Sequence, residues 1–136
     1  MAGLPEWERG TPGVLCAAGP HPIPISTAVR AGDDRLLFAL GTGRETLSRL
    51  RADPQSAFCL LGRGVAFTAH GRAAVVAEEL EAAETVAAVE LRVEQVQDHL
   101  ADGRTEMLDG ARWRWLDEGM DAAEDAIVAE LGRLAG

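Results

Sequence analysis

Hydrophobic and polar positions alternate along much of this chain with the two-residue period that is typical of β-strands. In residues 65–76 the odd-numbered apolar residues share one face, whereas Thr68, His70 and Arg72 fall on the opposite, polar face. Shorter apolar runs, separated by glycine, proline and aspartate, have the length of buried strands. The pattern therefore predicts strands at residues 14–18, 21–29, 36–40, 57–61 and 65–76.

The predicted strand over residues 21–29 begins irregularly, because Pro22 and Pro24 cannot donate backbone hydrogen bonds. We expect its start to lie at a sheet edge. Residues 31–34, Ala-Gly-Asp-Asp, have the composition of a turn, so this strand and the next one form a predicted hairpin.

Residues 78–100 fit two patterns. Apolar residues recur at spacings of three and four, as in a helix, but the part around Leu91 alternates as a strand does. We interpret the segment as a helical start followed by a strand from about Val86. Further on, residues 112–115 alternate strictly, with Trp113 and Trp115 on one face and two arginines on the other.

Two helices are expected. Residues 44–53 carry Leu47 and Leu50 on a narrow apolar stripe, and Pro54 ends the pattern. A C-terminal helix begins at Asp117 or Asp121 as N-cap and runs to Leu134. Its apolar stripe consists of Met120, Ile127, Leu131 and Leu134.

These elements predict a mainly β (α+β) fold, a six-stranded antiparallel barrel formed by one domain over residues 1–136. A short helix follows the third strand, and another helix ends the chain.

Composition narrows the classes of function. The net charge is −9 and all thirteen basic residues are arginine, which disfavours binding to nucleic acid or to an anionic membrane. No apolar run is long enough to cross a membrane, and the N-terminus does not resemble a secretory signal, so a cytoplasmic protein is expected. Cys16 and Cys59 lie in apolar runs and are expected to be buried hydrophobic residues, not a disulfide or a metal site.

The strongest candidate for a binding site is the corner where residues 38–41 lead through Thr42 and Gly43 into the predicted helix. A strand that passes through glycines into a helix start can present backbone N–H groups to an anion. Arg44 and Arg49 carry guanidinium groups suited to phosphate. The alternatives are a plain turn and a solvated helix face, respectively. The three histidines are scattered, so the sequence gives no metal site.

The order of these segments resembles the pyridoxamine 5′-phosphate oxidase-like split β-barrel family. The matching segments cover residues 13–77: Pro24-Ile25-Ser26-Thr27-Ala28, the strand 36–40, Arg49-Leu50-Arg51-Ala52-Asp53-Pro54 and the strand 65–76. The resemblance implies a homodimer that binds flavin mononucleotide (FMN), or the 8-hydroxy-5-deazaflavin coenzyme, in a groove at the subunit interface.

The resemblance also implies particular site residues. Family members commonly hold the phosphate with a lysine or arginine eight residues before the Asp-Pro proline, a position that is Thr46 here. Arg44 and Arg49 flank this departure and could replace the missing base. Ser26 and Thr27 would lie beside the flavin ring. The full expected set is Ser26, Thr27, Thr42, Gly43, Arg44, Thr46 and Arg49.

The resemblance implies an oxidoreductase in which the cofactor transfers a hydride to or from a small molecule. The alternative is a non-catalytic split-barrel dimer that binds a flavin or another ligand weakly or not at all, which the Thr46 departure favours. A third possibility is an unrelated small barrel with an apolar ligand. Trp113 and Trp115 could pack over a ring system, across a dimer interface, or against the C-terminal helix to close the core.

Overall fold

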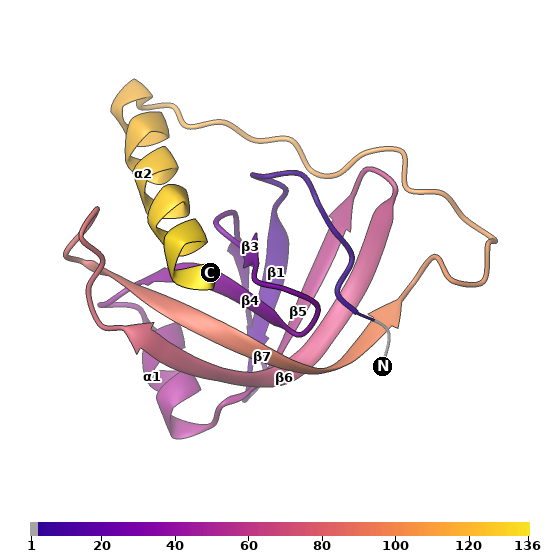
Figure 1. Ribbon diagram of the computed structural model, residues 1–136, viewed down its shortest axis with the longest axis horizontal. Coiled ribbons are helices and arrows are strands. Elements are labelled where there is room, and N and C mark those ends of the chain that lie inside the picture. The colour runs from indigo at the N-terminus through magenta and orange to yellow at the C-terminus, as the bar shows by residue number, and fades with distance from the viewer. Residues whose placement is uncertain (1–2) are drawn as a thin grey trace.

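The computed structural model describes residues 3–136, which form one antiparallel sheet of seven strands with two helices (Figure 1). The strand order is β2-β1-β5-β6-β7-β4-β3. The strands are β1 (Gly13–Ala17), β2 (His21–Ile25), β3 (Val29–Arg30), β4 (Arg35–Gly41), β5 (Gln55–Gly62), β6 (Val65–Ala77) and β7 (Val86–Asp98). The helices are α1 (Glu45–Ala52), between β4 and β5, and α2 (Glu118–Ala135).

The expected mainly β fold is confirmed, but the sheet has seven strands and not six. The predicted strand over residues 21–29 is divided into β2, which pairs with β1, and β3, which pairs with β4. Because β2 and β3 are the two edges of the sheet, residues 26–28 carry the chain from one edge to the other. The division also explains why α1 follows the fourth strand instead of the third.

The curled sheet buries a core on its inner face and a smaller one on the outer face of β4 and β7. Alternate residues of β4 serve the two cores: Phe38 lies in the inner cluster, and Leu37 in the outer cluster with Leu131 of α2. This double burial explains why residues 36–40 are apolar at every position, with no polar face. Trp7, from the N-terminal arm, closes the inner core against Phe58 and Phe67.

The long hairpin of β6 and β7 confirms the alternation in residues 65–76 and the strand from Val86. The helical start expected before Val86 is wrong, because residues 78–85 form turns. Their conformation is held by the carboxylate of Glu130 in α2, which accepts hydrogen bonds from the backbone N–H groups of Glu81 and Ala82 at 2.9 and 2.8 Å. A tertiary contact therefore overrides the local helical periodicity.

The segment between β7 and α2 has no strand. Residues 112–115 alternate in sequence but are irregular in the structure. Instead, Trp113 donates from Nε1 to the Gly10 carbonyl at 2.8 Å, and its ring meets that of Trp115 edge to face at 5.8 Å. The segment crosses the top of the molecule as an irregular ribbon (Figure 1).

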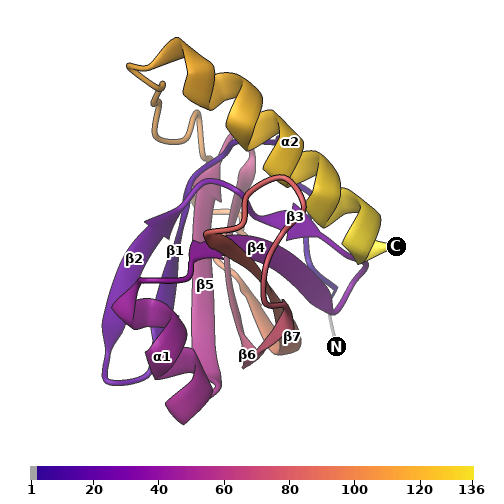
Figure 2. The ribbon, with the colours of Figure 1, turned by 90° about the vertical axis from the view of Figure 1, so that its left-hand side faces the viewer.

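The C-terminal helix begins as expected at Asp117, whose side chain accepts a hydrogen bond from the Gly119 N–H. It lies across the end of the sheet near β3 and β4 (Figure 2). No helix within residues 3–136 has the length and apolarity needed to cross a membrane. Both cysteines are free and half-buried, less buried than predicted, because they lie on the outer face of β1 and β5.

Candidate functional site

A cavity of about 250 Å³ lies between the sheet and the N-terminal half of α2. Residues 24–27 at the end of β2 form one wall, and residues 39–41 at the end of β4, with Arg44, form another. Trp115 and the α2 residues Met120, Glu124 and Ile127 cover it. The cavity therefore combines the point where the chain crosses between the two sheet edges with a helix from the far end of the chain.

The walls of this cavity are mainly apolar, with a few polar groups. The Ser26 hydroxyl donates to Oε1 of Glu124 at 2.8 Å. The Thr27 hydroxyl oxygen accepts a hydrogen bond from the Ala39 backbone N–H at 3.0 Å, which replaces a backbone pairing where the chain leaves the ladder. Arg44 is exposed, and no carboxylate in residues 3–136 lies within ion-pair distance of its guanidinium. Arg44 is thus available to an anionic ligand.

Trp115 contributes an unmet hydrogen-bond donor beside the cavity. Its indole Nε1 is buried and has no acceptor within the described part of the chain. A buried donor without a partner costs about 1–3 kcal/mol. The arrangement of Trp115 over the cavity is therefore less stable than its apolar contacts alone would make it.

The corner between β4 and α1 offers fewer free donors than predicted. The Thr42 backbone N–H and hydroxyl both donate to the Thr85 carbonyl, at 2.8 and 3.2 Å, and the Arg44 N–H donates to the Gly41 carbonyl at 3.1 Å. Gly43 is exposed and lies outside the cavity. Thr42 and Gly43 consequently form a turn tied to the β6–β7 connection, and neither lines the cavity.

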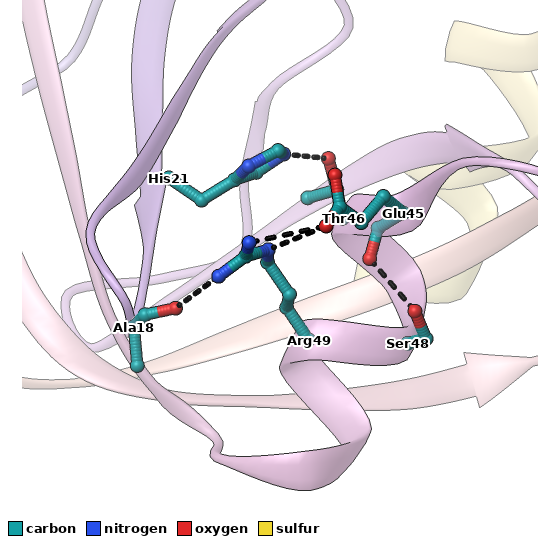
Figure 3. A network of polar contacts seen from close by, with 6 residues as sticks. All are labelled: Ala18, His21, Glu45, Thr46, Ser48 and Arg49. Atoms are coloured by element: carbon teal, nitrogen blue, oxygen red, sulfur yellow. Dashed lines mark hydrogen bonds and ion pairs between the residues drawn. The ribbon is translucent and has the colours of Figure 1, made fainter.

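Thr46 and Arg49 belong to a separate polar network at the turn between β1 and β2 (Figure 3). Thr46 is only 2% exposed, and its hydroxyl lies 3.0 Å from Nε2 of His21. The Arg49 guanidinium pairs with Glu45 at 3.1 Å and donates to the Ala18 carbonyl at 3.4 Å. Of the seven residues expected at the site, the structure brings Ser26, Thr27 and Arg44 together around the cavity.

Sequence reasoning missed the contribution of α2. The sequence pattern places Met120 and Ile127 on an apolar stripe but gives no indication that the stripe covers a cavity, and it assigns no role to Glu124. Ser26 and Glu124 are 98 positions apart, so no local pattern connects them. An acidic residue on the stripe side of an otherwise apolar helix face was the only available signal.

The histidines are not grouped. His70 contacts Gln97 and His99 contacts Thr68, both on the exposed face, while His21 contacts Thr46. Within residues 3–136, no three histidine, cysteine or acidic side chains are arranged to hold a metal ion.

No protein-family model matches the sequence, and a search of curated proteins found no match. Solved structures do match. A "putative pyridoxamine 5′-phosphate oxidase" from Lactobacillus delbrueckii is 16% identical, with a TM-score of 0.55 over 71% of this chain and 99% of that chain. A structure described as an F420 reductase is 13% identical, with a TM-score of 0.57 over 69% and 98%. HupZ from group A Streptococcus is 12% identical, with a TM-score of 0.57 over 75% and 90%.

These identities are too low to transfer an activity, but the shared architecture is extensive. The likeness covers most of each matched structure and agrees with the segment order that the sequence suggested. The chain therefore has the split β-barrel fold of the pyridoxamine 5′-phosphate oxidase-like proteins.

Proposed function

We propose that this protein binds a flavin-type cofactor, FMN or the 8-hydroxy-5-deazaflavin coenzyme, and acts as an oxidoreductase on a small molecule. The observation that carries the proposal is the cavity in which Ser26, Thr27 and Arg44 meet, since these are three of the seven residues expected to bind such a cofactor. Similar solved structures described as a pyridoxamine 5′-phosphate oxidase and as an F420 reductase support it.

The chemistry of the cavity suits such a cofactor. Its apolar walls match a flat aromatic ring system, and the unpaired guanidinium of Arg44 can hold a phosphate through charge-assisted hydrogen bonds. The bound cofactor would supply hydride transfer, while the chain binds it, orients it and excludes water. Among residues 3–136, the side chains that line the cavity include one carboxylate, that of Glu124, and no histidine or cysteine, which is consistent with chemistry supplied by a cofactor.

The volume of the cavity does not suit the whole cofactor. Pockets for ligands of drug size measure roughly 300–1,000 Å³, whereas this one measures about 250 Å³ with α2 in place. A flavin with its ribityl phosphate therefore needs either a displacement of α2 or a groove completed by a second subunit. We accordingly propose a homodimer with the cofactor at the interface, in the cytoplasm.

A second candidate function is a split-barrel dimer that binds a ligand without catalysis. Thr46, which replaces the basic residue expected in the family, is buried against His21, and Arg49 is engaged by Glu45 and Ala18. Of the residues at the corner that were expected to hold the phosphate with a basic group, Arg44 alone lines the cavity. A site with one guanidinium favours weak binding over the tight binding of a resident cofactor.

The experiment that tests the proposal is a fluorescence titration of the purified protein with FMN and with the deazaflavin coenzyme. Arg44→Ala is expected to weaken binding by about 2 kcal/mol, or roughly 30-fold in the dissociation constant, because a charge-assisted hydrogen bond is lost. Arg49→Ala is the matched control, since its guanidinium is used within α1 and the β1–β2 turn, and it should leave the affinity unchanged.

Three results would contradict the proposal. Binding of neither cofactor by the wild type would leave the non-catalytic alternative. An unchanged affinity in Arg44→Ala would remove the assignment of the phosphate to this cavity. A larger loss in Arg49→Ala than in Arg44→Ala would place the phosphate at the network of Figure 3 instead.

A further inference from the structure

We infer that the N-terminal half of α2 is a lid over the cavity, latched by the hydrogen bond between Ser26 and Glu124, which a cofactor must open in order to bind. The inference rests on the proposed function, because it concerns access to the same cavity. Two properties of the cavity lead to this inference. Its polar groups suit a phosphorylated flavin, but its volume is too small for the whole cofactor.

The two halves of α2 are held very differently. In the C-terminal half, Leu131 is completely buried in the outer core. The Glu130 carboxylate, 8% exposed, accepts two backbone hydrogen bonds from the β6–β7 connection, and Arg35 donates to the Ala135 carbonyl at 3.2 Å. These contacts anchor the end of the helix to the sheet.

The N-terminal half has no such anchor. Among residues 118–126, every residue except Glu124 is exposed. Within residues 3–136, its polar side-chain contacts to the rest of the protein are the Ser26–Glu124 hydrogen bond and an exposed ion pair of Arg9 with Asp125, and Met120 lines the cavity. Both ribbon views show this end of α2 farther from the strands than the C-terminal end (Figures 1 and 2).

The chain that leads into this half contains no helix or strand, and its ties to the rest of the protein include the Trp113 hydrogen bond to the Gly10 carbonyl and the Gly64 hydrogen bond to the Met107 carbonyl. Between β7 and α2 it forms only turns and irregular structure, which allows it to move with the helix. Trp115, at its end, covers the cavity with a buried indole N–H that has no acceptor. If the lid opened, this N–H group could donate to water. The free-energy cost of leaving it unpaired in the closed state therefore favours opening.

The latch uses a group that the ligand needs. The Ser26 hydroxyl lies in the expected cofactor site but donates to Glu124, which itself lines the cavity. Closure of the lid and binding of the cofactor therefore compete for the Ser26 hydroxyl. The apparent affinity of a ligand is reduced by the fraction of molecules in which the lid is open.

Hydrogen–deuterium exchange of the cofactor-free protein tests the lid directly. Amides of residues 122–126 should exchange faster than those of residues 128–134. The first four N–H groups of the helix are left out, because they lack helical acceptors in any case. Glu124→Ala should speed exchange at residues 122–126 by about fivefold, the factor that corresponds to one lost hydrogen bond of ~1 kcal/mol. Asp121→Ala removes an exposed carboxylate from the same half and should speed exchange there less than Glu124→Ala does, because it removes a favourable charge in the first turn but no hydrogen bond to the sheet.

A titration with FMN forms the second arm. Glu124→Ala should bind FMN about fivefold more tightly than the wild type, since the same lost bond releases the lid. Uniform exchange along α2, or exchange unaffected by Glu124→Ala, would overturn the lid. An unchanged FMN affinity in a variant with faster exchange would overturn the competition. If exchange follows the expected pattern but neither the wild type nor Glu124→Ala binds FMN or the deazaflavin, the lid is supported and the proposed function is contradicted.

Discussion

At the scale of single residues, Thr46 shows how the environment decides what a position can do. In the resembled family this position commonly holds a basic residue that reaches a phosphate. Here the side chain lies on the buried face of α1, and its hydroxyl contacts His21. The local sequence shows only that the base is missing, and the structure adds that the position faces the protein interior.

Restoring the family's residue should therefore fail. Thr46→Arg is expected to lower the free energy of unfolding by about 3 kcal/mol, because a buried guanidinium without a carboxylate partner loses its hydration. It should not tighten FMN binding. Urea unfolding followed by circular dichroism measures the loss, and Ser48→Arg, at an exposed position of the same helix, is the control. A stable Thr46→Arg variant with improved FMN affinity would show that this position faces the cofactor.

At the scale of elements, the β6–β7 hairpin depends on a close approach of two backbones. A Cβ atom added to Gly71 would lie 2.0 Å from the Arg92 carbonyl oxygen, beside the register shift between His70 and Gly71. Backbone atoms cannot move away as a flexible side chain can. The glycine is thus required by packing and not by its backbone angles.

Gly71→Ala should destabilise the protein by about 2 kcal/mol or more, since an added methyl group must push the two strands apart. Gly132→Ala provides a control, because it should increase the stability of the protein instead of lowering it. It lies in α2, no atom lies within 4 Å of its added Cβ, and alanine is favoured over glycine in helices by about 0.5–1 kcal/mol. Thermal or urea unfolding of both variants measures the difference. Equal effects of the two substitutions would contradict the close approach.

At the scale of the whole molecule, the strands form a sheet whose two edges, β2 and β3, are joined by residues 26–28. The same three residues provide Ser26 and Thr27 to the cavity, and α2 lies over them. The site therefore lies at the point where the barrel is left incomplete. An open edge of this kind is also where a second subunit could complete a groove.

The homodimer is a prediction at this scale. Light scattering coupled to size-exclusion chromatography should give twice the mass of one chain, 14.4 kDa, at micromolar concentration. FMN should increase the dimer fraction if the cofactor contacts both subunits, because a ligand stabilises the state that binds it. A monomer with and without FMN would contradict the interface groove and would leave the third possibility, an unrelated ligand-binding barrel.

The sequence by itself determined most of the strands and the two helices, and it limited the N-cap of α2 to Asp117 or Asp121, because alternation, periodicity and capping are properties of neighbouring residues. The family resemblance, carried by the order of the segments, pointed correctly to the fold. Local pattern failed at residues 78–85. There, a buried carboxylate from α2 decided the conformation.

Only the tertiary structure decided which candidates share a site. It separated Arg44 from Arg49 and placed α2 over the cavity. The physical reason is that a hydrogen bond such as that of Ser26 to Glu124 joins residues 98 positions apart. Such contacts depend on the path of the whole chain, and no local periodicity records them.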